Sequence, residues 1–330
     1  MKLLIQIPCY NEEDTLPITL SDLPQHIHGI DTIERLIIND GSRDRTVEVA
    51  RELGVEHVVS FPSNKGLAHG FMAGLDACLR LGADIIVNTD ADNQYCGADI
   101  ETLVRPILDG KAEIVIGERP IDTTEHFSWH KKKFQHLGSW VVRIASGSDI
   151  PDAPSGFRAY SREAAMRLNV INDYSYTLET IIQARRNRMG MMSVPIRTNA
   201  ETRPSRLFSS MGRYIKRSSS VIIRSALMYR PLSFFCTIGG ILFSIGIFLG
   251  LRYLFFLIAQ GSSGHIQSLI LCAVLLLSGF QTMLLGLQAD VMAANRKLIE
   301  DVQYRVRRIE SDGMRSAASD GENGSKHETR

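Results

Sequence analysis

Two long stretches without a charged residue constrain this chain of 330 residues more than any other feature. The first runs from Leu232 to Leu251 and the second from Ile266 to Leu287. A helix rises about 1.5 Å per residue, so each stretch can cross a hydrocarbon core of about 30 Å. We therefore expect transmembrane helices over 231–259 and 266–288, joined by a short uncharged turn. The alternative, a pair of core helices in a soluble protein, is disfavoured because uncharged runs of this length are rare there.

Positive charge flanks this hairpin on both sides. Seven basic residues and no acidic ones lie between Arg203 and Arg230, ahead of the first stretch. Further basic residues follow the second stretch, namely Arg296, Lys297, Arg305, Arg307 and Arg308. Because segments rich in Lys and Arg stay in the cytoplasm, this distribution predicts a multi-pass protein of the inner membrane. Both termini and the large N-terminal region are predicted to be cytoplasmic.

Composition excludes some classes of partner and of site. The 37 Lys and Arg residues are balanced by 36 Asp and Glu residues, so the net charge gives no indication of nucleic-acid binding. The five cysteines are scattered and form no Cys-x-x-Cys pair. This pattern argues against a disulfide framework and against a zinc ribbon.

In residues 1–206, short apolar runs alternate with segments of helical spacing. The runs read as buried parallel strands and are Leu3–Ile7, Leu36–Asn39, His57–Ser60, Ile85–Thr89 and Ile114–Gly117. The helical segments between them are Thr15–Leu23, Asp44–Leu53, Gly66–Leu81 and Ala98–Leu108. This alternation predicts a doubly wound, Rossmann-like α/β sheet with ligands at the carboxyl ends of its strands. Further helices are expected over Phe127–Ala145 and Tyr176–Asn187, with Asp152–Arg158 as the loop between them.

Two carboxylates follow the fourth predicted strand. In the sequence Asp90-Ala91-Asp92, alternate residues of an irregular loop can converge on one hard cation with oxygen ligands. Mg²⁺ or Mn²⁺ held there would neutralise charge on a departing nucleotide diphosphate. The simpler alternative is a turn in which Asp bonds to its own backbone. The position of the pair at a strand end favours the metal site.

A third carboxylate, Asp40, follows the second predicted strand. Ser42 or Asp44 can cap the next helix, whereas Asp40 stands before Gly41 and has no capping role there. We interpret Asp40 as an acceptor for a base N–H or a ribose hydroxyl of a nucleotide. The Gly-rich dinucleotide and P-loop signatures are both absent from the sequence, which argues against a dinucleotide enzyme or a P-loop kinase.

Four motifs in this order resemble the family-2 glycosyltransferases of the GT-A fold. They are Ile7-Pro8-Cys9-Tyr10-Asn11-Glu12-Glu13, the run Asn39 to Thr46, Asn64-Lys65-Gly66 and Asp90-Ala91-Asp92. Later segments are similar to the polyprenyl-phosphate branch, close to dolichyl-phosphate-mannose synthases. These are Asp152 to Arg158, Glu179, Thr202 to Arg206 and Tyr229-Arg230-Pro231.

The resemblance implies an inverting transfer of a sugar from a nucleotide-diphosphate-sugar to a membrane polyprenyl phosphate. It places the metal on Asp90 and Asp92, and the phosphate of the acceptor or of the diphosphate on Arg203 and Arg206. The residues that it assigns to the nucleotide-sugar are Pro8, Tyr10, Asn11, Glu12, Asp40, Lys65, Asp90, Ala91, Asp92 and Gln94.

The chemistry of such a transfer rests on charge and positioning. A lipid phosphate is largely ionised near pH 7, so it needs little help from a general base. The catalytic residues that we expect are Asp92, Asp152 as a base or an acceptor-orienting group, and Arg158 as a phosphate clamp. The alternative for Asp152 is a loop aspartate that accepts hydrogen bonds from backbone amides. The alternative for Arg158 is an ordinary surface cation.

The remaining segments suggest contacts with the membrane and between subunits. Apolar and basic residues are mixed in 207–230, which suits amphipathic helices on an anionic leaflet. We expect a cytoplasmic helix over 289–310 and a disordered tail over 311–330. Small residues in the first span, Gly239, Gly240, Gly246 and Gly250, would allow close packing between protomers of a homo-oligomer.

Two other functions remain open at this level. The chain could be a glycosyltransferase acting on another lipid hydroxyl, for which a base such as Asp152 would be indispensable. It could instead be an inactive membrane-anchored binding or assembly subunit. The donor sugar, the nucleotide base and the prenyl chain length are not determined by the residues.

Overall fold

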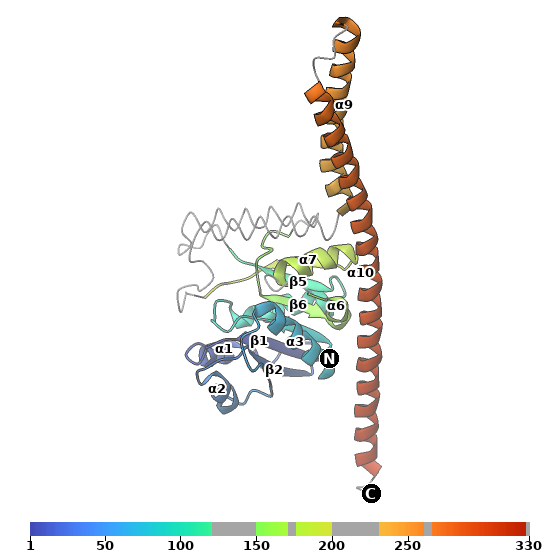
Figure 1. Ribbon diagram of the computed structural model, residues 1–330. Helices are drawn as coiled ribbons and strands as arrows, with labels where there is room; N and C mark the ends of the chain where they lie inside the picture. The colour runs from blue at the N-terminus through green and yellow to red at the C-terminus, as the bar shows by residue number, and fades with distance from the viewer. Residues whose placement is uncertain (121–149, 171–175, 200–230, 261–265, 328–330) are drawn as a thin grey trace. The chain divides into compact units, whose positions relative to one another are not determined.

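The computed structural model describes residues 1–120, 150–170, 176–199, 231–260 and 266–327 (Figure 1). These residues form two compact units. The first contains Met1–Ser209 together with Asp301–Arg330, and the second contains Ser210–Glu300. The predictions for Arg203, Arg206, the helix over Phe127–Ala145 and the amphipathic segment 207–230 lie outside the described residues.

A sheet of seven strands forms the centre of the first unit, in the order β3-β2-β1-β4-β6-β5-β7. Each strand pairs in parallel with its neighbours except β6, which is antiparallel to both β4 and β5. The strands are β1 Lys2–Cys9, β2 Thr32–Asn39, β3 His57–Ser60, β4 Ile85–Asn88, β5 Ile114–Glu118, β6 Arg158–Ser161 and β7 Met191–Pro195.

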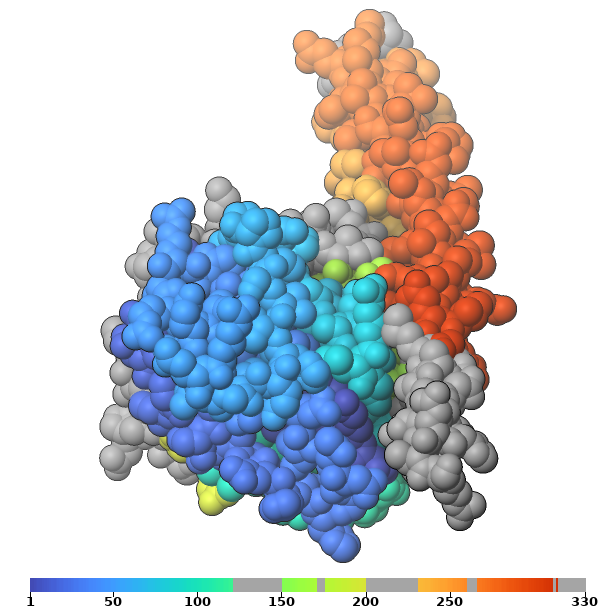
Figure 2. Space-filling model, turned by 90° about the horizontal axis from the view of Figure 1, so that it is seen from below, coloured from blue at the N-terminus to red at the C-terminus, as the bar shows by residue number. Residues whose placement is uncertain are grey.

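Helices cover both faces of this sheet. They are α1 Leu16–Asp22, α2 Thr46–Glu52, α3 Leu67–Arg80, the 3₁₀ turn η1 Gly97–Asp99, α4 Ile100–Leu108, α6 Arg162–Arg167 and α7 Tyr176–Arg186. Alternate residues of β1 face opposite layers, since successive side chains of a strand point to opposite faces. Leu4 packs with α3, α6 and α7, whereas Leu3, Ile5 and Ile7 pack with α1, α2 and α4. Figure 2 shows a face of this unit formed mainly by the N-terminal part of the chain.

The predicted strands and helices up to Leu108 are confirmed to within two residues at most boundaries, and the mixed doubly wound class is confirmed as well. The sequence analysis did not find β6, β7 or α6. Each is at most six residues long, and β6 contributes only Ala159 and Tyr160 as apolar residues. Such short segments contain too few residues for the hydrophobic periodicity of a strand or a helix to be recognised.

The loop after β2 packs tightly against the loop after β3. Gly41 has φ +71°, a left-handed conformation that residues with a side chain rarely adopt. A Cβ built on Gly41 would lie 2.6 Å from the backbone carbonyl carbon of Ser63 and 2.7 Å from the backbone nitrogen of Asn64. Only glycine therefore lets these two loops approach so closely.

The second unit contains two helices long and apolar enough to cross a membrane. They are α9, Pro231–Gln260, and the first part of α10, Ile266–His327. Only 6% and 17% of their most apolar windows are buried, in contrast to the core helix of a soluble protein. A Cβ on Gly239 would lie 2.7 Å from the carbonyl oxygen of Gly279, and one on Gly246 would lie 3.0 Å from Leu276. These glycines pack α9 against α10 of the same chain, and packing between protomers through them stays a prediction.

The helix α10 is longer than expected. It continues without interruption from the second apolar stretch through 289–310 to His327. The structure thus places a helix where a disordered tail over 311–330 was predicted. No proline occurs after Pro231, so the backbone can continue an established helix into a polar sequence.

A pair of glycine variants tests the loop contact after β2. Gly41→Ala combines a strained φ with a steric clash, each costing about 1–3 kcal/mol, so the melting temperature of the full chain should fall clearly. Gly54→Ala is the matched control, because Gly54 has a similar φ of +72° but a Cβ at this position would meet nothing within 4 Å. Thermal unfolding followed by circular dichroism measures both. Equal shifts in the two variants would show that the loop contact contributes nothing.

Candidate active site

The loop after β4 carries Asp90 and Asp92, both half-buried. Its backbone is fixed from two sides. The hydroxyl of Thr19 donates to the carbonyl oxygen of Ala91 at 3.0 Å. The side-chain amide of Asn199 donates to the carbonyl oxygens of Asn93 and Tyr95, and the backbone nitrogen of Gln94 donates to Asp92 Oδ1 at 3.2 Å. The two carboxylates are therefore presented by a loop that is itself held in place.

A second loop, Asp152–Phe157, lies directly against Asp90. A Cβ built on Gly156 would lie 3.2 and 3.3 Å from the carboxylate oxygens of Asp90. The backbone nitrogen of Gly156 donates to Tyr95 Oη at 3.2 Å, and its carbonyl oxygen accepts from Asn88 Nδ2 at 2.9 Å. Asn88 Nδ2 also donates to Tyr176 Oη at 3.1 Å. Buried polar side chains from β4, from the loop after it and from α7 thus hold this loop beside the end of β4.

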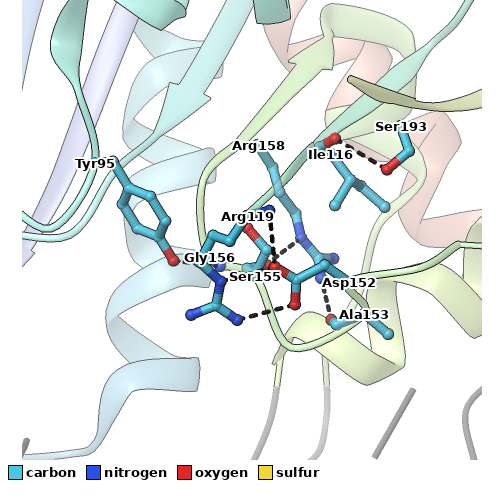
Figure 3. A network of polar contacts seen from close by, with 9 residues as sticks. All are labelled: Tyr95, Ile116, Arg119, Asp152, Ala153, Ser155, Gly156, Arg158 and Ser193. Carbon is cyan, nitrogen blue, oxygen red and sulfur yellow. Dashed lines mark hydrogen bonds and ion pairs between the residues drawn. The ribbon is translucent and has the colours of Figure 1, made fainter. Parts of the chain in front are cut away.

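An ion pair holds the start of the same loop (Figure 3). Asp152 is fully buried, and it accepts from Arg119 Nε at 2.7 Å and from Arg119 Nη2 at 2.9 Å. Burial alone would lower the pKa of the Arg119 guanidinium, but Tyr95 and Asp152 beside it raise that pKa above its ordinary value. Arg119 therefore stays charged. Burial also raises the pKa of Tyr95 to about 12, so its hydroxyl stays protonated.

This geometry favours one of the two roles predicted for Asp152. Both of its carboxylate oxygens face the same guanidinium, and none of its surface is exposed. Both oxygens are already engaged by Arg119 and neither reaches solvent, so no open oxygen of Asp152 is left to meet an acceptor hydroxyl. Orientation of the loop is thus better supported for Asp152 than general-base catalysis, and its place in the reaction stays a prediction.

The structure corrects the role predicted for Arg158. Its side chain is fully buried at the beginning of β6 and donates to four oxygens of its own chain. The acceptors are the carbonyl oxygens of Ala153, Ser155 and Thr177 and the hydroxyl of Thr180, at 2.6–2.8 Å. No donor is directed to solvent, so Arg158 cannot clamp a phosphate in this structure. It is a positioning residue that holds the loop preceding it (Figure 3).

The predicted nucleotide residues after β1 are also part of a hydrogen-bonded loop. Asn11 has φ +55°, and its Oδ1 accepts from the backbone nitrogen of Arg43 at 2.8 Å. Glu12 is buried and accepts from Thr15 Oγ1 at 2.8 Å. In contrast, Tyr10 leaves 39% of its surface exposed and Pro8 is half-buried. The exposed ring of Tyr10 can stack on a base, whereas Asn11 and Glu12 shape the loop.

Asp40 has a structural role that the sequence did not indicate. Its two oxygens accept from the backbone nitrogens of Lys65 at 2.7 Å and Gly66 at 2.9 Å, immediately before α3. Asp40 caps no helix, as expected, since the N-cap of α3 is Gly66 and has no side-chain cap bond, but its carboxylate binds residues that lie 25 and 26 positions further along the chain. The Nζ of Lys65 lies 4.9 Å from the centre of the Phe61 ring. Contacts of Asp40 and Lys65 with a nucleotide stay predictions.

The donor set at the end of β4 suits a hard cation bound together with a diphosphate. In the described part of the chain, no three His, Cys, Asp or Glu side chains gather as a metal site. Asp90 and Asp92 nevertheless provide two half-buried carboxylates on a fixed loop. Mg²⁺ typically binds through one or two carboxylates and takes its other oxygens from phosphate and water. These two residues therefore fit a shared metal site.

Four contributors to the site were missed by the sequence analysis: Asn88, Tyr95, Arg119 and Tyr176. A signal existed for two of them. Asn88 is a polar residue inside an otherwise apolar strand, and Arg119 follows the carboxyl end of β5. No comparable signal marks Tyr95 or Tyr176, because their partners come from distant segments.

Comparison with known proteins shows the family of the chain. The profile of the family described as glycosyl transferase family 2 matches residues 4–168, and the chain belongs to this family. It is therefore a glycosyltransferase, and its mixed α/β unit is a GT-A catalytic domain.

Several relatives are similar over most of their own length. UDP-N-acetylglucosamine--dolichyl-phosphate N-acetylglucosaminyltransferase of Methanococcus voltae is 31% identical over 58% of this chain and 83% of that protein. Polyprenol monophosphomannose synthase of Mycolicibacterium smegmatis is 28% identical over 58% and 76%. Undecaprenyl-phosphate mannosyltransferase of Micrococcus luteus is 30% identical over 59% and 83%.

A solved structure supports the fold. Glucosyl-3-phosphoglycerate synthase from Mycobacterium tuberculosis, in complex with Mn²⁺, uridine diphosphate and phosphoglyceric acid, matches with a TM-score of 0.53 at 18% identity. The match covers 68% of this chain and 77% of that one. The same enzyme has also been crystallised with Mg²⁺ and uridine diphosphate. At this identity the likeness concerns the fold alone.

The contact between Gly156 and Asp90 leads to a test of the site. In Gly156→Ala, the new Cβ would lie 2.9 Å from Tyr176 Oη as well as against Asp90, so the loop or the carboxylate must move. Displacements of this size typically reduce turnover about tenfold to a hundredfold, and we expect such a loss in sugar transfer. Gly190→Ala is the control, since its Cβ would meet other atoms at no less than 3.6 Å. Equal turnover in both variants would remove this contact from the catalytic site.

Proposed function

We propose that this chain transfers a sugar from a nucleotide-diphosphate-sugar to the phosphate of a membrane polyprenyl lipid, with inversion at the anomeric carbon. The observation that carries the proposal is the contact of Asp90 with the loop Asp152–Phe157. It brings the carboxylates expected to hold the diphosphate next to the segment expected to receive the acceptor. The two apolar helices supply a means of keeping such a site at a membrane.

The relatives support the lipid acceptor. Their names describe transfer of N-acetylglucosamine or mannose to dolichyl, polyprenol or undecaprenyl phosphate. The acceptor class is common to all three, whereas the sugar differs between them. We therefore propose the acceptor class and leave the sugar to the experiment.

The reaction can proceed with the groups that the site provides. An ionised phosphate oxygen of the lipid attacks the anomeric carbon, the bond to the diphosphate breaks, and a nucleoside diphosphate leaves. Mg²⁺ or Mn²⁺ on Asp90 and Asp92, when bound, neutralises charge on the leaving diphosphate. Arg119 keeps a positive charge beside the acceptor loop, and Asp152, Arg158 and Asn88 keep that loop in position. No proton has to be removed from the acceptor, so a paired Asp152 is no obstacle.

The alternative with a lipid hydroxyl as acceptor is less well supported. Such an acceptor must lose a proton, which requires a free base near the anomeric carbon. The residue proposed for that task, Asp152, is buried and paired with Arg119. An inactive binding subunit would not need the second loop to be fixed against Asp90 by several buried hydrogen bonds.

We also propose how the chain is placed in the cell. The apolar helices would cross the inner membrane twice, with the GT-A unit and both termini in the cytoplasm, as the flanking Lys and Arg residues indicate. Arg203 and Arg206 would then bind phosphate close to the headgroups. The segment 207–230 would lie along the leaflet beside anionic lipids.

The proposed function is tested by incubating the purified full-length chain with a panel of labelled nucleotide-sugars and with undecaprenyl phosphate or undecaprenol. We expect label to become extractable into organic solvent with the phosphate and not with the alcohol. Transfer to the alcohol, or to diacylglycerol in a parallel incubation, would favour the hydroxyl-acceptor alternative. No transfer from any donor would contradict the proposal.

Substitution of the second carboxylate tests the metal assignment. Asp92→Asn removes a negative ligand, so transfer should fall by about a hundredfold or more at saturating Mg²⁺ or Mn²⁺, because charge stabilisation of this kind is worth several kcal/mol. The same exchange of acid for amide at Glu101, an exposed residue in the first turn of α4, is the control. Titration of the metal should show a weakened dependence only in Asp92→Asn. Unchanged transfer in that variant would exclude Asp92 from the site.

A further inference from the structure

The part of α10 that follows the apolar stretch carries a second apolar pattern. A set of six residues, five of them apolar, recurs at alternating spacings of three and four positions. We call this set the α10 stripe. Its members are Met292, Asn295, Ile299, Val302, Val306 and Ile309. The five apolar members are between 47% and 72% exposed, although α10 is a continuous helix here (Figure 1). A row of apolar side chains left open to this extent marks an interaction surface.

The spacing identifies the type of surface. A repeat of 3.5 residues is the signature of a coiled coil, in which positions a and d of a heptad face another helix. Met292, Ile299 and Val306 occupy position a, while Asn295, Val302 and Ile309 occupy position d. β-Branched residues at both positions are typical of the seams of such assemblies.

Among the described residues, the polar contacts of α10 with its own catalytic unit are made off this seam. Tyr304 Oη donates to Glu163 Oε1 at 2.7 Å, and Arg307 Nη1 donates to the carbonyl oxygen of Leu168 at 2.6 Å. Arg307 also pairs with Asp76 at 2.9 Å. Tyr304 and Arg307 occupy heptad positions f and b, which lie on the outer side of a coiled-coil helix. Through Tyr304 and Arg307, α10 thus contacts its own catalytic unit with the outer side of the helix, and positions a and d lie on another side.

The charges beside the stripe are complementary to those of the same helix in another copy. Arg305 occupies position g and Glu310 the following position e. In a parallel coiled coil, a residue at g lies near the residue five positions later, at e, of the neighbouring helix. Arg305 of one copy would therefore meet Glu310 of a second copy, with opposite charge. Within the chain, Arg305 pairs with Asp301, but their side chains are 72% and 56% exposed, so this pair is weak.

We propose that the α10 stripe binds the α10 stripe of a second copy of this chain in a parallel coiled coil. A seam of fewer than three heptads is marginal for free helices. Apolar helices confined to one membrane raise the effective concentration of their neighbours, which compensates for a short seam. The proposal is independent of the sugar-transfer reaction, and it assigns the contact between copies to residues 292–309 rather than to the glycines of α9.

Cysteine cross-linking in membranes tests this contact with the full chain. Val306→Cys places a thiol at position a, and Lys297→Cys places one at position f, on the outer side of the same helix. Copper-phenanthroline accepts two electrons as two thiols lose their protons and form one disulfide. We expect a covalent dimer in Val306→Cys, several-fold more abundant than in Lys297→Cys or in the unsubstituted chain with its five natural cysteines. Equal dimer formation at both positions, or none at Val306→Cys, would overturn the proposal.

Reversal of the flanking charges provides an independent check. In the Val306→Cys background, Arg305→Glu would place two acids opposite each other and reduce cross-linking. Adding Glu310→Arg would exchange the two charges and restore it. Failure of this rescue, or a covalent product of Val306→Cys with the mass of a complex with another protein, would contradict pairing between copies. Sugar transfer measured on the same membranes is a separate readout, so failure of the proposed function would leave this result interpretable.

Discussion

The candidate site depends on a buried charge that must be compensated. A carboxylate without solvent costs several kcal/mol unless an opposite charge and hydrogen bonds satisfy it, and Asp152 has no exposed surface. Arg119 meets this requirement with a two-point contact. The loop that begins at Asp152 is then continued by Gly156, which is tied to Asn88 and lies against Asp90. Because this ion pair is costly to break, it keeps the loop Asp152–Phe157 in place beside Asp90.

The sequence predicted the first half of the domain well for a physical reason. Parallel strands buried on both faces are apolar throughout, and helices of at least two turns show their spacing, so the alternation up to Leu108 could be recognised. Beyond it, β6 and β7 are four and five residues long and pair with strands distant in sequence. Their presence depends on tertiary pairing, which local composition does not show.

The site residues show the same contrast between features that a local pattern reveals and features that depend on tertiary contacts. Asp90 and Asp92 were found because they follow a recognisable strand, and the structure places them on a fixed loop. Arg158 was misread as a phosphate clamp and the backbone contacts of Asp40 were missed, since the oxygens and nitrogens that they bind come from elsewhere in the chain. A charged residue in a loop motif looks the same in sequence whether it meets a ligand or a backbone. Partners of this kind become visible only in the folded chain.

The reversed direction of β6 has a consequence for how this enzyme class can diversify. Arg158, the first residue of β6, pairs with Asn88 at the end of β4 and with Ile116 near the end of β5. Both ends of the connection from β5 to β6 therefore lie at the catalytic rim of the sheet. Residues can be added to or removed from the connection between β5 and β6 without changing the order of the strands. A change in the length of this connection would therefore alter the rim of the sheet while β1 to β4 keep their pairing.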